Sequence, residues 1–324
     1  MLELRYPMFD GETIWEGALV TVENGIITSM QACDPALCGQ GLLMPGLVEA
    51  HAHMGTTAQV KEMLQSGVTT VCDVSAPKEL EAAGPLMLIR SAGMAMGIVM
   101  NPRGYVEQAA ANGAKYIKVL LFHVRSIGKK ALRGIVLAAH EKNLKVAVHA
   151  TEVATVRQAV EAGADILLHV PMKEPFPAEL AKEIADKGIA VAPTLVMMQT
   201  FARGGQNGYE LAHYQNAERA VRLLKDCGVM LLAGTDANPG SFAPGVGYGD
   251  TLHHELELMV RAGLTPVEAL TAATSSNARA FGLQAGRIAP GCAATMLLVN
   301  GRPDRQIEDS RKLSKVWVRG EEVR

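Results

Sequence analysis

The chain has 324 residues and a formal net charge of −2, with 48% hydrophobic and 20% charged residues. This length and composition fit one large or two average globular domains with a sizeable core. Aromatic residues make up only 4% of the chain, and no run of like charges occurs, so neither a base-stacking surface nor a basic footprint for nucleic acid or anionic membrane is expected.

Cysteine usage and the N-terminal residues indicate the compartment. The five cysteines form no CxxC pair and are scattered along the chain: Cys33, Cys38, Cys72, Cys227 and Cys292. An odd, scattered set is typical of reduced thiols. The first residues contain no apolar core of signal-peptide length, and no stretch approaches about 18 uninterrupted apolar residues. We therefore expect a cytoplasmic protein without a membrane span.

The first 42 residues contain short alternating β-like runs, such as 18–21 and 25–30, separated by turns. After them, eight apolar segments are typical of strands: 43–52, 68–75, 86–93, 115–121, 145–150, 165–170, 189–197 and 229–236. Five of these segments follow a glycine at the end of a helical stretch: Gly67, Gly113, Gly163, Gly188 and Gly228. Glycine closes a helix in the left-handed conformation, and a strand that is apolar throughout is covered on both faces.

Repeated units of this kind predict an α/β fold with parallel strands. Eight alternating units favour a closed (β/α)8 barrel. An open doubly wound sheet usually carries a Gly-rich phosphate loop after its first strand, and MPGLVEAHAHMG is not one. Between the strands, residues 152–162 place Val153, Val156 and Val160 on one helical face. Thr265 and Pro266 form a strong helix start.

The last segment, 287–324, again holds alternating β-like runs, at 295–299 and 315–318. Two marginal β segments at opposite ends of a chain can pair with each other. We therefore expect a small β-sandwich module made of residues 1–42 and 287–324, beside a barrel made of residues 43–286.

Six potential metal ligands lie on the expected strands, mostly at their carboxyl ends: His51, His53, Lys118, His149, His169 and Asp236. Barrel enzymes build their active sites at that end. His51 and His53 are two residues apart on a strand, so their side chains face the same side. Imidazole and carboxylate bind Zn²⁺ and other divalent metals. A single histidine of this kind would be read as a core residue, but the joint placement predicts one shared metal site.

The same segments resemble the amidohydrolase superfamily, and within it the imidazolonepropionase-like and Xaa-Pro dipeptidase-like branch. MPGLVEAHAHMG is similar to the first-strand motif of that superfamily, and GAKYIKVLL to its fourth-strand lysine motif. VAVHAT, ILLHV and LLAGTDA resemble the fifth, sixth and eighth. The segment HHELELMVRAGLTPVEAL resembles the helical end of the barrel, and GRIAPGCAATMLLV and VWVRGEEV the C-terminal strands. The resemblance covers nearly the whole chain.

The resemblance implies a two-metal site, with zinc as the expected metal. His51, His53 and Asp236 would hold one ion, and His149 and His169 the other. Lys118 would bridge both ions as a CO2-derived carbamate; without the motif it would be read as a lysine that reaches the rim or pairs with an acid. A hydroxide between the metals would cleave the amide C–N bond of a dipeptide, an N-acyl amino acid or a cyclic amide, with Asp236 transferring the proton.

Candidate substrate contacts follow two strands. His123 and Arg125 come after Lys118, and Arg125 can pair with a carboxylate. Asn238 and Tyr248 lie in the Gly- and Pro-rich loop after Asp236. A surface role is the alternative for each. We expect a small-molecule substrate and leave a homo-oligomer open.

Two other functions stay open at this point. A mononuclear deaminase or imidazolonepropionase-like ring hydrolase is suggested by Glu152, because related deaminases use a glutamate three residues after the fifth-strand histidine. The same residue also suits the first turn of a helix. A non-catalytic barrel that binds a ligand ranks lowest, because all six expected ligand types are present.

Overall fold

The computed structural model describes residues 1–121, 127–205, 208–241 and 243–324. Within them the chain has an α/β fold with two parallel sheets. One sheet has the order β5-β6-β7 and the other the order β12-β11-β10-β9-β8. The strands are β5 (Leu47–Ala52), β6 (Val68–Asp73), β7 (Met87–Arg90), β8 (Met94–Ala95), β9 (Tyr116–Leu121), β10 (Lys145–Ala150), β11 (Ile166–Leu168) and β12 (Ala190–Ala192).

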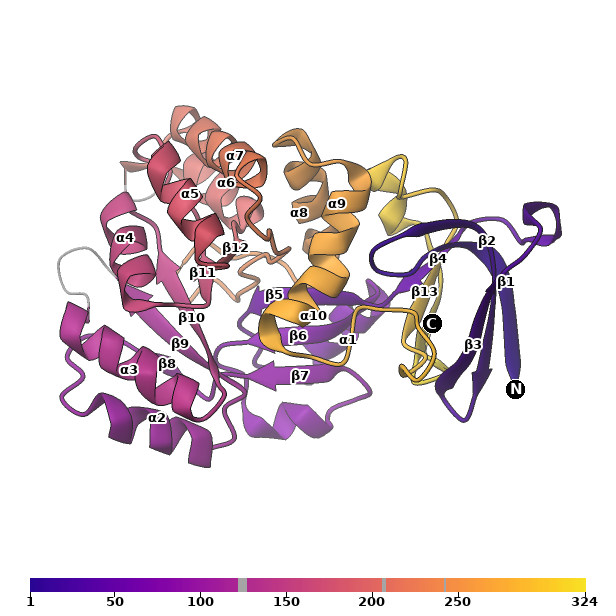
Figure 1. Ribbon diagram of the computed structural model, residues 1–324, viewed down its shortest axis with the longest axis horizontal. Helices are drawn as coiled ribbons and strands as arrows, with labels where there is room; N and C mark the ends of the chain where they lie inside the picture. Colours follow the sequence, from indigo (N-terminus) through magenta and orange to yellow (C-terminus); the bar gives the residue numbers. More distant parts are fainter. Residues whose placement is uncertain (122–126, 206–207, 242) are drawn as a thin grey trace.

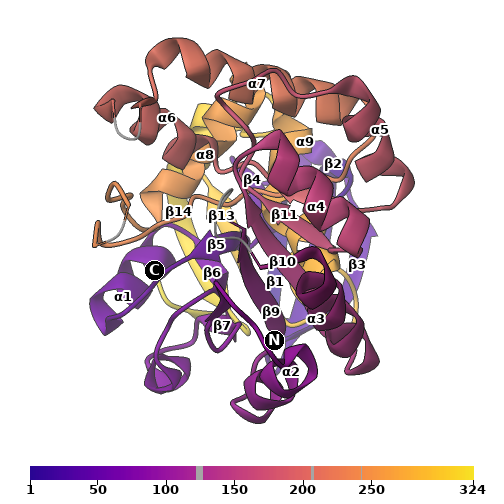
Figure 2. The same ribbon diagram turned by 90° about the vertical axis from the view of Figure 1, so that its left-hand side faces the viewer.

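Helices lie outside these strands. They are α1 (Thr57–Gln65), α2 (Pro102–Ala111), α3 (Lys129–Glu141), α4 (Val153–Ala162), α5 (Ala178–Asp186), α6 (Leu195–Gly204), α7 (Leu211–Asp226), α8 (Asp250–Arg261), α9 (Pro266–Thr271) and α10 (Asn277–Phe281). Figure 2 shows α2 to α7 arranged around β9, β10 and β11. Every residue of β5, β6 and β9 is buried, as parallel strands covered on both faces require.

Four expected strands differ from the prediction. The first, 43–52, divides at Gly46: residues 42–45 join the sheet of the chain ends, where they pair antiparallel with residues 296–299, and the parallel strand β5 begins at Leu47. The third, 86–93, ends at Arg90 and resumes as β8, because Ala92 and Gly93 have positive φ angles of 58° and 122°. The seventh, 189–197, stops at Ala192, because Thr194 turns the chain with a φ of 50° and α6 begins at the next residue.

The eighth expected strand, 229–236, has no ladder of its own and is marked by isolated bridges, Val191↔Leu231 and Ala52↔Ala237. Its backbone is nevertheless bonded on both sides. Toward β12, the Leu232 N–H donates to Val191 O at 2.9 Å. Toward β5, the Ala50 N–H donates to Ala233 O at 3.1 Å. Residues 230–237 therefore lie between the outer strands of the two parallel sheets.

A third sheet joins the two ends of the chain, in the order β15-β14-β13-β4-β1-β2-β3. Its strands are β1 (Leu2–Phe9), β2 (Ile14–Glu23), β3 (Ile26–Ala32), β4 (Leu42–Pro45), β13 (Met296–Val299), β14 (Leu313–Val318) and β15 (Glu321–Glu322). β13 pairs antiparallel with β4. Figure 1 shows this sheet to one side of the parallel strands. It has an apolar core of its own, which includes Met8, Ile27 and Trp317.

His253 of α8 connects the C-terminal segment to the helices around the parallel strands. Its imidazole is buried, with Nδ1 3.0 Å from Ser310 Oγ and Nε2 3.0 Å from the carbonyl oxygen of Ser66. Burial lowers the pKa of His253 from 6.5 to about 4. These contacts give His253 a structural role. In the described part of the chain, no helix is long and apolar enough to cross a membrane.

The buried imidazole of His253 makes stability depend on pH. In the unfolded chain, His253 is protonated below about pH 6.5, whereas in the folded protein it is protonated only below about pH 4. Stability is therefore lost as the pH falls through this window, by up to about 3 kcal/mol. In urea unfolding at about pH 7 and about pH 4.5, we expect His253→Gln to lose about 2 kcal/mol less than the wild type. An equal loss of stability in His253→Gln and the wild type would contradict this role.

Candidate metal centre

The six side chains expected to bind metal come from separate elements and face one place. His51 and His149 lie on β5 and β10, and His53 follows β5 directly. His169 follows β11, and Asp236 lies in the segment that runs beside β5. Lys118 is inside β9 and is 1% exposed. Parallel strands bring all of these ends to one edge, as barrel enzymes do.

The distances between these groups are short. Nε2 of His51 is 3.2 Å from Oδ1 of Asp236, and Nε2 of His53 is 3.1 Å from the same oxygen. Nζ of Lys118 is 3.3 Å from Nε2 of His51. The ring centroids of His149 and His169 are 4.4 Å apart, and those of His51 and His169 are 5.5 Å apart. The structure therefore brings together all six side chains.

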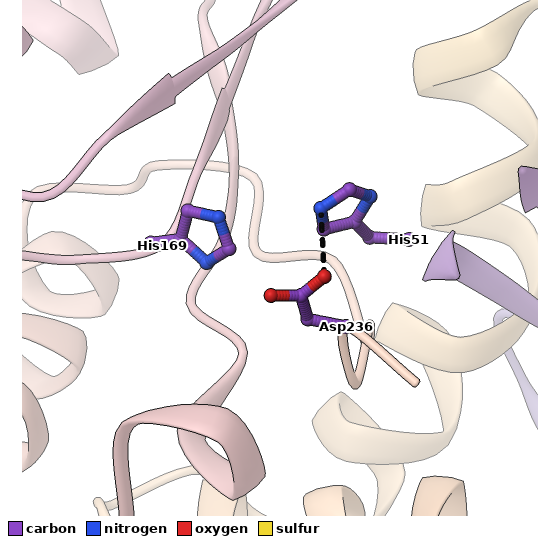
Figure 3. Close-up of side chains that lie close together, drawn as sticks. All are labelled: His51, His169 and Asp236. Carbon is purple, nitrogen blue, oxygen red and sulfur yellow. Dashed lines mark ion pairs between the residues drawn. The ribbon is translucent and has the colours of Figure 1, made fainter. Parts of the chain in front are cut away.

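Three of them fit a metal ion directly. His51, His169 and Asp236 are buried, and one ligand atom from each lies within 4.8 Å of the others. In Figure 3, both rings and the carboxylate face a common space. Nε2 of His169 and Oδ1 of Asp236 are buried and form no hydrogen bond, although Oδ1 lies 3.1 to 3.2 Å from two imidazole nitrogens. Buried polar atoms without a partner are rare, and a divalent cation would satisfy both. The donor set suits Zn²⁺ and similar ions.

The imidazoles are in the protonation state that metal binding needs. Burial, with Lys118 next in effect, lowers the pKa of His149 from 6.5 to about 3. Burial also lowers the pKa of His51 and of His169 well below the ordinary value. These rings are therefore neutral at physiological pH. Burial lowers the pKa of Lys118 to about 7, so its amine is also readily uncharged.

Backbone strain concentrates at these strand ends. His169 and Asp236 have positive φ angles of 73° and 59°, and Thr194 has 50°. Non-glycine residues in such conformations cost about 1–3 kcal/mol each and gather at functional sites. Nδ1 of His169 lies 2.7 Å from Oγ1 of Thr194. When Nδ1–H donates to this hydroxyl, Nε2 keeps its lone pair for a ligand bond.

Glu49 was not among the expected site residues. It precedes His51 by two positions on β5, so period-two geometry places both side chains on one face. Its Oε1 accepts from the backbone N–H groups of His51 and Thr235, each at 2.9 Å. Its Oε2 accepts from Oγ1 of Thr235 at 2.8 Å. Burial raises the pKa of Glu49 to about 7. This carboxylate ties the first ligand strand to the segment that carries Asp236.

Asp73, at the end of β6, has a similar position next to His53. Its oxygens accept from the backbone N–H groups of Met54 at 2.6 Å, Ser75 at 2.8 Å and Ala76 at 2.6 Å. Oγ of Ser75 lies 3.3 Å from Nδ1 of His53. Burial raises the pKa of Asp73 to about 6. No sequence motif distinguishes this aspartate from a helix cap.

Two of the four expected substrate contacts, Tyr248 and Asn238, lie within the described residues. Tyr248 is half-buried, and its hydroxyl donates to the carbonyl oxygen of His53 at 2.8 Å. Asn238 is buried, and its amide bonds to the carbonyl of Asp236 and to the backbone of its own loop. We therefore assign Asn238 to holding this loop. His123 and Arg125 lie outside the described residues.

A sequence model of the Amidohydrolase family matches residues 42–323. This chain belongs to the amidohydrolase family. Membership confirms the sequence-based prediction that the chain is an enzyme and a hydrolase. A curated relative, ochratoxinase from Aspergillus niger, is 28% identical over 269 residues, which cover 74% of this chain and 51% of that protein. The chain thus spans about half the length of this relative.

Solved structures support the same fold. A Xaa-Pro dipeptidase with bound methionine matches with a TM-score of 0.83 and 18% identity, over 99% of this chain and 98% of that one. A putative prolidase from Bifidobacterium longum has a TM-score of 0.81 and 23% identity, over 99% and 94% of the two chains. The crystal structure of A. niger ochratoxinase gives 0.81 and 20%, over 99% and 94%.

The two buried carboxylates beside the ligands should respond differently to neutralisation. In Glu49→Gln, the amide oxygen still accepts both backbone N–H groups, and the new NH2 can donate to Thr235. In the wild type, both oxygens of Asp73 accept backbone N–H groups. In Asp73→Asn, the NH2 group replaces one of these oxygens and must therefore face an N–H donor. We expect Asp73→Asn to lower the free energy of unfolding by about 1–2 kcal/mol more than Glu49→Gln.

Urea unfolding at about pH 8, where both carboxylates are largely ionised, measures this difference. An equal or reversed order of the two variants would show that these hydrogen bonds do not control the local backbone.

Proposed function

We propose that this amidohydrolase family member is a metal-dependent hydrolase that cleaves the amide C–N bond of a small substrate. The observation that carries the proposal is the convergence of buried ligand atoms that lack hydrogen-bond partners, Nε2 of His169 and Oδ1 of Asp236. The names of its relatives, which include ochratoxinase, dipeptidases and molinate hydrolase, support the reaction class.

We further propose the complete architecture. The parallel strands and residues 230–237 form one closed (β/α)8 barrel over residues 43–286. The hydrogen bonds of residues 230–237 to β12 and β5 support closure on that side. On the other side, the Lys115 N–H donates to Arg90 O at 2.8 Å, which links the start of β9 to β7. Residues 1–42 and 287–324 form the small β-sandwich module.

The proposed metal ligands divide into two groups. His51, His53 and Asp236 would hold one ion, and His149 and His169 would hold the other. Lys118, as a carbamate, would be a ligand of both. Divalent ions bound there, with zinc as our first choice, would polarise a substrate carbonyl and make water more acidic. The low pKa of Lys118, about 7, supports carbamate formation, because the uncharged amine is the form that reacts with CO2.

The protein groups then carry the proton. Oδ1 of Asp236 is directed at the two histidines of β5, so we assign the proton to Oδ2. This oxygen takes a proton from the attacking water and delivers it to the leaving nitrogen. An amide nitrogen needs that proton to leave as an amine. Tyr248, from the loop after Asp236, fixes the backbone of His53 through its hydroxyl.

One observation favours a site with a single ion. The atoms that lie within 4.8 Å of one another come from His51, His169 and Asp236, which suffice as the three protein ligands of a catalytic zinc. A deaminase or ring hydrolase of this kind would use Glu152. In the structure Glu152 precedes α4, where its backbone N–H donates to Oγ1 of Thr155 at 3.2 Å. A helix-capping role accounts for that bond.

Lys118 is the residue that separates the two versions. In Lys118→Ala, the group shared by two ions is lost, so we expect hydrolysis to fall by a factor of at least about 10². In the wild type, isotope-labelled bicarbonate should give a carbamate signal in NMR that this variant lacks. The exposed Lys115→Ala, on the same segment, is the control and should keep both properties. Full activity of Lys118→Ala would rule out the two-ion site.

The reaction class is tested by a substrate panel. Dipeptides, N-acyl amino acids and cyclic amides should be hydrolysed by the wild type and not by Asp236→Asn, which cannot take up the proton. Turnover of aminated rings or imidazolone-type rings alone, dependent on Glu152, would replace amide hydrolysis by the alternative.

A further inference from the structure

The start of helix α6 lies next to the metal centre and has an unusual cap. The first N–H groups of a helix have no partner inside it, and the residue before the helix normally accepts one of them with its side chain. Here that residue is Thr194, which makes no such bond. Its Oγ1 instead lies 2.7 Å from Nδ1 of His169. Another group must therefore accept the first N–H groups of α6.

Glu255 of α8 supplies that group. Its Oε1 accepts the N–H of Leu195 at 2.8 Å, and its Oε2 accepts the N–H of Val196 at 2.7 Å. The side chain is 0% exposed. Within the described part of the chain, no cation forms a salt bridge with this carboxylate. The positive end of the α6 dipole and the two N–H groups favour the ionised form, whereas burial raises the pKa of Glu255 to about 8.

We propose that Glu255 is a positioning residue for the metal centre, because it caps α6 and so leaves the Thr194 hydroxyl to hold His169. This inference rests on the proposed metal site. The two hydrogen bonds given for Glu255 among the described residues go to the start of α6 and not to an expected ligand. It acts through the start of α6, then Thr194, then the imidazole.

The local backbone explains why such support is needed. Both His169 and Thr194 have positive φ angles, and for a β-branched residue such as threonine this conformation is a true outlier. Surrounding contacts must therefore hold it. If the carboxylate no longer accepted both N–H groups, the nearest alternative acceptor for the helix would be the Thr194 hydroxyl. The imidazole would then lose its partner.

Loss of that partner has a specific chemical effect. The hydrogen bond from Nδ1–H to Thr194 keeps the proton off Nε2, which is the atom directed at Asp236 and His51. Partners of this kind set the tautomer of a ligand histidine, and their removal weakens metal binding about 10- to 100-fold. A purely structural cap would lower stability and leave both the tautomer and the metal affinity unchanged.

The test compares Glu255→Gln with the wild type. The amide keeps one acceptor oxygen but faces the second N–H with an NH2 group. Zn²⁺ affinity, measured by competition with a chromophoric chelator, should fall about 10- to 100-fold for the weaker of the bound ions. Nitrogen NMR of metal-free protein labelled at histidine should show the Nδ1–H tautomer of His169 in the wild type and its loss in the variant.

Three further variants separate positioning from stability. Thr194→Val should likewise lower Zn²⁺ affinity and abolish the Nδ1–H tautomer of His169. Thr194→Ser, which keeps the hydroxyl, should have the affinity and tautomer of the wild type. The double variant Glu255→Gln/Thr194→Val should bind Zn²⁺ no more than about threefold more weakly than the worse single variant, because both act through one contact. Glu257→Gln is the control on the same helix. Its carboxylate pairs with Arg311 and His254 instead of α6, so affinity should stay at the wild-type value.

The outcomes separate this inference from the proposed function. A wild type that binds no divalent ion overturns the metal site, while the tautomer of His169 still tests Glu255. A folded Glu255→Gln with wild-type affinity and tautomer overturns the positioning role, as does additivity in the double variant. If Glu255→Gln does not fold, Glu255→Asp replaces it, since the shorter side chain weakens both N–H bonds and should shift both readouts in the same direction.

Discussion

The burial of many polar groups at one edge of parallel strands is the constraint on which the rest of this structure depends. His51, His169 and Asp236 are buried there, and one ligand atom from each lies within 4.8 Å of the others. Nε2 of His169 and Oδ1 of Asp236 form no hydrogen bond. Burial keeps the imidazoles neutral, which weakens their repulsion and leaves their lone pairs available. The arrangement is favourable only if a cation completes it and if the backbone around it is held rigidly.

Backbone rigidity comes from buried carboxylates beside the ligands. Glu49 accepts N–H groups from β5 and from the segment before Asp236, and Asp73 accepts those that follow His53. Glu255 does the same at the start of α6. Each carboxylate is stabilised by backbone N–H groups and not by a surface cation. His169 and Asp236 can therefore take strained backbone conformations that a strand alone would not maintain.

The sequence predicted the features that depend on local pattern. Glycine after a helix identified the turns before β6, β9 and β11, and Gly67, Gly113 and Gly163 all have positive φ angles. Thr265 forms the expected capping box with Glu268. The candidate ligands were predicted because strand ends and residue types coincide, and the resemblance to the family motifs added Lys118. Each of these signals lies within a few residues of the chain.

The missed features depend on contacts between distant segments. The positive φ of Thr194 ends β12 early, and nothing in the segment around it distinguishes this threonine from a strand residue. Glu255 meets Leu195 from 60 positions away, so its role is invisible to periodicity. The expected eighth strand, 229–236, is not a regular strand, because its backbone hydrogen bonds go in turn to β12, to β5 and to the Glu49 side chain. Glu49 itself could have been found from its spacing to His51.

The central claim, that the polar cluster is a metal centre, is tested most directly by the metal content of the wild-type protein. Protein purified without chelators in the presence of bicarbonate would be analysed for divalent metals per chain. We expect about two equivalents of divalent metal per chain, held by His51, His53, Lys118, His149, His169 and Asp236. One equivalent would limit the site to a single ion. No bound metal, even after reconstitution of folded protein with Zn²⁺, would contradict the claim.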